Sequence, residues 1–192
     1  MQELKDRIIK EGRVLPGNII KVDGFLNHRI DTELMDHIAE EFGKHFDMDK
    51  VTLILTAEAS GIALSAIVAR HFGKPMVFAK KAKSDNIEGG LYQSDIFSYT
   101  YKKKVTLLVS KEWMTAEDKV LVIDDFMANG EAMRGLCDIV KAAGAELVGI
   151  GCAVEKGFQG GGDRLRAAGV NLKSLAIIES AEPGNIVFRD DD

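Results

Sequence analysis

A pair of neighbouring carboxylates, Asp124 and Asp125, follows a hydrophobic run over residues 119–123. After this pair come five residues that lead into a predicted helix: Ala128, Asn129, Gly130, Glu131 and Ala132. The backbone N–H groups of such a loop, with the helix dipole behind them, form a binding site suited to a phosphate monoester. Gly130 would let the backbone approach the phosphate closely, and the two carboxylates suit sugar hydroxyls. An alternative is purely structural: the Asp pair caps the helix and Gly130 serves the turn.

A second loop of small residues lies at 58–61, ahead of a predicted helix over 62–71. Ala59, Ser60 and Gly61 would present backbone amides to another anionic group at the start of this helix. A plain N-cap at Ser60 explains the same residues equally well.

Two widespread nucleotide-binding motifs are absent from the sequence. No Gly-x-x-x-x-Gly-Lys-[Ser/Thr] occurs, and the glycine pair Gly149 and Gly151 lies inside a predicted strand without a third glycine. The glycine run at 160–162 predicts a flexible connection before a helix over 163–168. Anion binding is therefore expected at the first two loops.

Short apolar and β-branched runs predict the strands that must position these loops. They are found at 51–55, 75–78, 119–123, 147–154 and 175–178. Helical patterns lie between them, and two alternating strands over 93–113 predict a hairpin. The first 48 residues look helical at both ends, with a loop and one short strand between. Strands that alternate with helices predict an α/β fold with three layers and a mostly parallel sheet, whose ligands bind beyond the carboxyl ends of the strands.

The hydrophobic strand, the paired Asp, the small-residue turn and the amphipathic helix together resemble the phosphoribosyl diphosphate (PRPP) signature of type I phosphoribosyltransferases. Asn129 stands where threonine is common in that family, and it keeps a polar side chain. The resemblance implies that Asp124 and Asp125 are catalytic and hold the ribose. It also implies that residues 128–132 bind the 5′-phosphate and that residues 59–61 contact the diphosphate. A mobile flap is implied over 97–104, where a solvated hairpin tip is the alternative.

Three further segments, 18–29, 56–61 and 153–158, resemble the purine-salvage members of this family that use xanthine. The base-binding residues implied by this resemblance are Ile20, Asn27, Lys156 and Phe158. Lys156 and Asn27 would donate to two purine oxygens, and the other two residues would supply apolar walls. A solvated strand end is the alternative for Lys156. A base with two carbonyl groups suits these donors better than adenine does.

The implied reaction joins xanthine to PRPP and gives xanthosine 5′-monophosphate (XMP) and diphosphate. Mg2+ would be the cofactor, held mainly by PRPP and water, with no metal site made of protein side chains alone. Hypoxanthine or guanine is the alternative base, and a non-catalytic PRPP-sensing regulator is a less favoured function. The implied architecture is one domain, 1–192, in a homodimer, with a hood-forming segment at 1–48, a core at 49–180 and a C-terminal tail at 181–192.

The composition favours a protein that acts on small molecules. A net charge of -5, from 25 basic and 30 acidic residues, offers no basic excess for nucleic-acid binding. No apolar run approaches the ~18 residues of a membrane span, and the charged N-terminus does not resemble a secretory leader. We therefore expect a cytoplasmic protein without nucleic-acid or membrane partners. Cys137 and Cys152 lie among apolar residues and are expected to be reduced thiols.

Overall fold

A six-stranded sheet with the order β10-β9-β8-β7-β3-β4 forms the middle of the molecule in the computed structural model, which describes residues 1–81, 90–98 and 103–190. Its strands are β3 (Leu53–Ala57), β4 (Met76–Ala79), β7 (Lys119–Met127), β8 (Glu146–Lys156), β9 (Leu172–Glu182) and β10 (Asn185–Phe188). Neighbouring strands from β4 to β9 are parallel, and only β10 runs antiparallel to its neighbour. The predicted mostly parallel sheet is confirmed.

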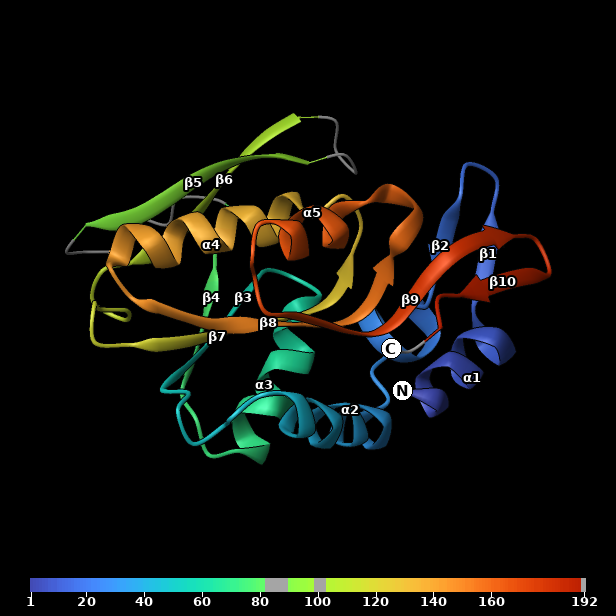
Figure 1. The fold of residues 1–192 in the computed structure, drawn as a ribbon, viewed down its shortest axis with the longest axis horizontal. Coiled ribbons are helices and arrows are strands. Elements are labelled where there is room, and N and C mark those ends of the chain that lie inside the picture. The colour runs from blue at the N-terminus through green and yellow to red at the C-terminus, as the bar shows by residue number, and fades with distance from the viewer. Residues whose placement is uncertain (82–89, 99–102, 191–192) are drawn as a thin grey trace.

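Helices cover both faces of this sheet (Figure 1). They are α1 (Gln2–Glu11), α2 (Thr32–His45), α3 (Gly61–His71), α4 (Glu131–Ala143) and α5 (Gly161–Ala167). In Figure 1, α2 and α3 lie below the sheet, and α4 and α5 lie above it. The buried apolar side chains accordingly form two clusters, one against α2 and α3 and one against α4. The α/β fold with three layers is therefore confirmed. No helix in the described ranges is both long and apolar enough to span a membrane.

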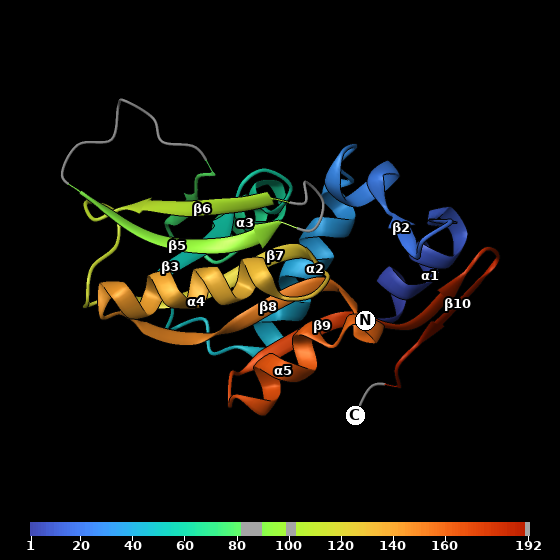
Figure 2. The same ribbon diagram turned by 90° about the horizontal axis from the view of Figure 1, so that it is seen from above.

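The predicted hairpin consists of β5 (Leu91–Ser98) and β6 (Lys103–Ser110), which pair antiparallel and lie along α4 (Figure 2). Ile96 and Leu107 face the helix at Gly135, where any Cβ would collide with both side chains. This glycine allows the hairpin to pack closely on α4. The outer part of the expected flap, residues 99–102, lies outside the described residues.

The N-terminal segment has the two predicted helices, but its middle is more ordered than expected. The strands β1 (Arg13–Leu15) and β2 (Ile19–Lys21) pair as a small hairpin, and a π-helical turn follows over Asp23–Asn27. The C-terminal segment expected as a tail also contains a strand, β10, because Ile186 and Phe188 pack against the core. The β1–β2 hairpin and the antiparallel pair of β9 and β10 lie side by side at one end of the sheet (Figure 1).

Candidate active site

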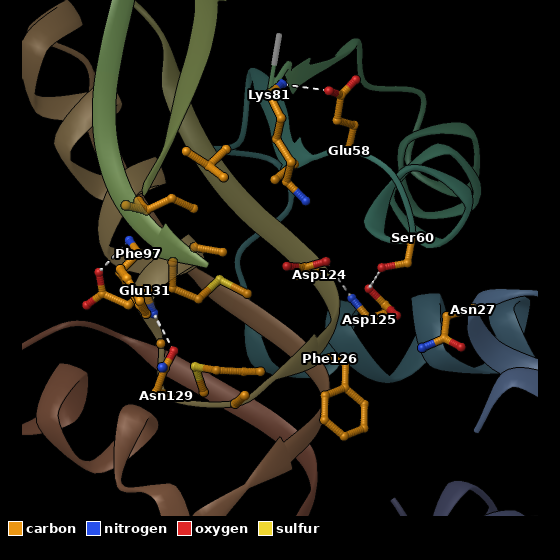
Figure 3. Close-up of a pocket in the computed structure, with 18 of the residues that line it drawn as sticks. Asn27, Glu58, Ser60, Lys81, Phe97, Asp124, Asp125, Phe126, Asn129 and Glu131 are labelled. Atoms are coloured by element: carbon orange, nitrogen blue, oxygen red, sulfur yellow. Dashed lines mark hydrogen bonds between the residues drawn. The ribbon is translucent and has the colours of Figure 1, made fainter. Parts of the chain in front are cut away.

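An open pocket of about 330 Å3 lies at the carboxyl ends of β3 and β7, as expected for this type of sheet (Figure 3). Most of the residues singled out in the sequence line it: Ile20, Asn27, Ser60, Asp124, Asp125, Ala128, Asn129, Gly130, Glu131 and Ala132. Ala59, Gly61, Lys156 and Phe158 are not among its lining residues. Lys81 and Phe126, which sequence reasoning missed, also line it.

The two carboxylates lie inside β7 rather than after it, because this strand continues to Met127. An oxygen of Asp125 accepts a hydrogen bond from the Ser60 hydroxyl (2.8 Å), and Asp124 accepts one from the Asp125 backbone N–H (3.0 Å). Neither residue caps α4, because the N-cap of this helix is Gly130, which has no side chain to accept a capping hydrogen bond. The capping alternative for the Asp pair is therefore wrong. The other oxygen of Asp125 is buried and has no hydrogen-bond partner in the described part of the chain.

Burial and the negative charge of Asp125 together raise the pKa of Asp124 well above its usual range. Lys81 opposes this shift only weakly, although its side chain points into the pocket toward the carboxylates (Figure 3). Burial and the neighbouring charge thus disfavour the charged form of Asp124 relative to an exposed aspartate. The pocket combines two nearly buried carboxyl groups with one lysine, which suits a ligand that carries both hydroxyl and anionic groups.

The loop 128–132, called the phosphate loop here, turns from β7 into α4 through Gly130, which has a φ of +81°. The first N–H groups of a helix have no partners within the helix, so this loop offers donors to an anion. Asn129 accepts a hydrogen bond from the backbone N–H of Glu131 (3.3 Å). The Glu131 carboxylate contacts Arg134 (3.2 Å) and the backbone N–H of Phe97 (3.4 Å), which links the loop to the hairpin (Figure 3).

The loop 58–61 contains a cis peptide bond between Glu58 and Ala59. Glu58 accepts a hydrogen bond from the backbone N–H of Lys81 (2.6 Å), and this bond places the lysine at the pocket. Ser60 occupies the N-cap position of α3, as the alternative expected, but its hydroxyl makes no capping hydrogen bond and donates to Asp125 instead. A Cβ at Gly61 would collide with Thr56 and Asp124, so this glycine is required for packing behind the carboxylate.

The four residues expected to bind a base do not all lie together. Lys156, at the end of β8, is half-buried and donates a hydrogen bond to the backbone carbonyl of Asn18 (3.1 Å). Its ammonium group is therefore not simply solvated, as the alternative for this residue expected. Burial lowers the pKa of this lysine, and its ammonium lies 5.5 Å from the ring centre of Phe126. Phe158 packs against the hydrophobic core. Phe126 therefore supplies the apolar surface between Lys156 and the pocket.

Phe126 could have been found from strand alternation, because it lies two residues after Asp124 on the same strand. Lys81 gave no such signal, since it follows a short strand and an ordinary lysine there is solvated. The described residues contain no group of three or more His, Cys, Asp or Glu side chains able to hold a metal ion. A Mg2+ ion at this pocket would therefore take its ligands mainly from a phosphorylated substrate and water.

Comparison with known proteins identifies a family domain and full-length relatives. Residues 25–168 match the model of a phosphoribosyl transferase domain. A xanthine phosphoribosyltransferase from Bifidobacterium adolescentis is 52% identical over 192 residues, covering 98% of this chain and 100% of the relative. One from Lachnoclostridium phytofermentans is 53% identical over 193 residues and covers 100% of both.

Solved structures support the fold independently. The adenine phosphoribosyltransferase of Giardia lamblia, complexed with 9-deazaadenine, superimposes with a TM-score of 0.76 at 21% identity, covering 93% of this chain and 98% of that one. The enzyme of Trypanosoma brucei gives a TM-score of 0.73 at 21% identity over 91% of this chain and 78% of that one. At these identities the likeness concerns the fold.

Proposed function

The chain belongs to the phosphoribosyltransferase family, and from that premise we propose that it transfers the phosphoribosyl group of PRPP to N9 of xanthine. The products are XMP and diphosphate, as in purine salvage. One observation carries the proposal: two buried carboxyl groups lie beside a phosphate loop in a single pocket. Xanthine is favoured because the full-length relatives that share about half of the sequence bear the name of that activity.

The reaction places few covalent demands on the protein. Purine N9 forms a bond to ribose C1, the bond from C1 to diphosphate breaks, and the leaving group takes the electron pair. The N9 proton passes to solvent. Positioning and charge stabilisation are therefore the main contributions expected from the chain. In this proposal, Asp124 and Asp125 hold the ribose hydroxyls while the phosphate loop binds the 5′-phosphate.

Residues 59–61 and Lys81 are proposed to contact the diphosphate. Lys81 supplies a positive charge on the side of the pocket formed by the 58–61 loop. The unpartnered oxygen of Asp125 would gain a donor from a ribose hydroxyl, which removes the cost of an unsatisfied buried acceptor. Mg2+ would be held mainly by PRPP and water, and it would neutralise charge on the leaving diphosphate.

The base is proposed to lie between Asn27 and Lys156, which can donate hydrogen bonds to two purine oxygens. Ile20 lines the pocket and supports an apolar wall, whereas Phe158 is partly buried against the core and does not line the pocket, which makes it a less direct contact. We add Phe126 as an apolar surface for the base, because it lines the pocket and lies next to the Lys156 ammonium.

A spectrophotometric screen with PRPP and Mg2+ tests the proposal. Xanthine, guanine, hypoxanthine and adenine are compared at equal concentrations, and xanthine should have the highest kcat/KM. A preference for any other base would refute the assignment of xanthine, and no turnover with any of the four would refute the enzymatic proposal.

We further propose a cytoplasmic homodimer that binds no nucleic acid, on the resemblance to this family and the acidic net charge. The division into a hood at 1–48, a core at 49–180 and a tail at 181–192 also stays a proposal. Light scattering of the purified protein measures the oligomeric state directly.

A further inference from the structure

The side of the phosphate loop that faces α5 is in direct contact with the start of that helix. A Cβ at Gly161 would lie 2.5 Å from the carbonyl carbon of Asn129 and 2.7 Å from the backbone nitrogen of Gly130. These are backbone atoms, so no side-chain rotation could relieve the collision. The glycine run at 160–162 is thus not the flexible connection expected from its composition, because α5 already begins at Gly161.

A hydrogen bond from α5 also fixes one peptide unit of the phosphate loop. Nη2 of Arg164 donates to the carbonyl oxygen of Asn129 (2.8 Å). In a trans peptide the carbonyl and the following N–H point in opposite directions within one plane. Holding the Asn129 carbonyl toward α5 therefore turns the N–H of Gly130 away from α5, and Gly130 lines the pocket.

The helix that carries Arg164 is itself anchored by an ion pair to one buried carboxylate. Glu155 of β8 has no exposed surface, and it accepts hydrogen bonds from Arg166 (2.7 and 3.1 Å) and from the Ser174 hydroxyl. Gly162 packs directly on the Glu155 carboxylate, where a Cβ would collide. A helix of seven residues has little stability by itself, so these contacts determine its position.

We propose that Arg164 is a positioning residue, which orients the Gly130 N–H for the 5′-phosphate by holding the Asn129 carbonyl against α5. The inference rests on the proposed function, because it requires that the phosphate loop bind the 5′-phosphate. Arg164 is exposed and touches the loop from outside the pocket lining, so it acts through the backbone rather than on the substrate.

Binding measurements with two ligands that differ only in the 5′-phosphate test this role. Calorimetry compares XMP with xanthosine for the wild type, Arg164→Met and Arg164→Lys. Arg164→Met keeps an apolar stem but removes the donors, and we expect its XMP affinity to fall about tenfold while its xanthosine affinity and Tm stay unchanged. Arg164→Lys retains one donor and should recover part of the XMP affinity. In steady-state kinetics the KM for PRPP should rise while kcat stays nearly constant, since the contact exists in both the ground state and the transition state.

Arg70→Met is the matched control, because it removes the same charge from an exposed position at the far end of α3. It should bind both ligands like the wild type. An unchanged XMP affinity in Arg164→Met, or equal losses for XMP and xanthosine, would overturn the positioning role. If instead the wild type binds XMP no more tightly than xanthosine, the phosphate loop itself is wrongly assigned. This result distinguishes a failure of the proposed function from a failure of the positioning role of Arg164.

Discussion

Gly130→Ala tests whether the turn into α4 serves a ligand or only the fold. Gly130 has a φ of +81°, a conformation that costs an alanine about 1–2 kcal/mol. The new Cβ would also lie 3.3 Å from Cα and 3.4 Å from the carbonyl oxygen of Gly161, so the two backbones must separate slightly. At about 2–4 °C for each kcal/mol, the Tm should fall by about 2–8 °C. Alanine keeps the backbone N–H, but separating the two backbones moves this donor away from a bound phosphate. Losing one hydrogen bond to a charged phosphate costs about 1.5–3 kcal/mol, or about 10- to 150-fold in PRPP affinity.

Gly144→Ala at the other end of α4 is the control. Gly144 has a φ of +73°, and its Cβ would lie 3.3 Å from Cβ of Ala116, so the strain is similar but remote from the pocket. Thermal melts should show comparable losses for both variants, and calorimetry with PRPP and Mg2+ should show weakened binding for Gly130→Ala alone. If both variants melt early and both bind PRPP like the wild type, Gly130 serves only the turn and the reasoning fails. If both lose affinity equally, the loss reflects general destabilisation.

Three other variants test the carboxylates, the proposed base contact and the contact between α1 and α2. Because burial and Asp125 raise the pKa of Asp124 in the folded protein, its favourable contribution is present at low pH and is lost as the pH rises through that raised pKa. Asp124→Asn should therefore raise the Tm more at pH 8 than at pH 5 while turnover falls, and a gain independent of pH would contradict this. Lys156→Met should lower kcat/KM for xanthine about 10- to 100-fold and leave the PRPP affinity nearly intact, whereas an equal loss for xanthine and adenine would refute a contact with a purine oxygen. The adjacent Glu3 carboxylate raises the pKa of His37, so Glu3→Gln should lower that pKa. An unchanged NMR titration of His37 would show that this pair does not form in solution.

The order and type of the core elements could be predicted because local patterns and tertiary packing agree. Apolar β-branched runs became the parallel strands, and an amphipathic pattern became α4. The strand ends were less predictable. The carboxylates at 124 and 125 interrupt the apolar pattern of β7, but pairing of Asp124 with Cys152 and of Met127 with Glu155 continues the strand beyond them. Hydrogen bonding to a neighbouring strand is a non-local property that the run itself does not contain.

The same distinction explains which parts of the site were predicted. The Asp pair and the phosphate loop are contiguous in the chain, so their residue types indicate their chemistry directly. Lys81 and Phe126 line the pocket only because of their position in the fold. That position depends on how the 58–61 loop and β7 are arranged relative to one another. The glycines at 161 and 162 show the reverse error: their composition is typical of a flexible linker, yet each is required by one close contact with another segment.

Three local departures from ordinary folding rules lie together in one pocket. They are a carboxyl group with a raised pKa, a buried acceptor that has no partner among the described residues, and a glycine with positive φ. Each is unfavourable or neutral for the folded protein alone, and each suits a ligand that brings hydroxyl donors and a phosphate. Around them, the Glu155 network and Gly161 place α5 firmly against the phosphate loop. Close packing contacts thus lie behind the site, and the unsatisfied Asp125 oxygen belongs to the pocket in which PRPP is proposed to bind.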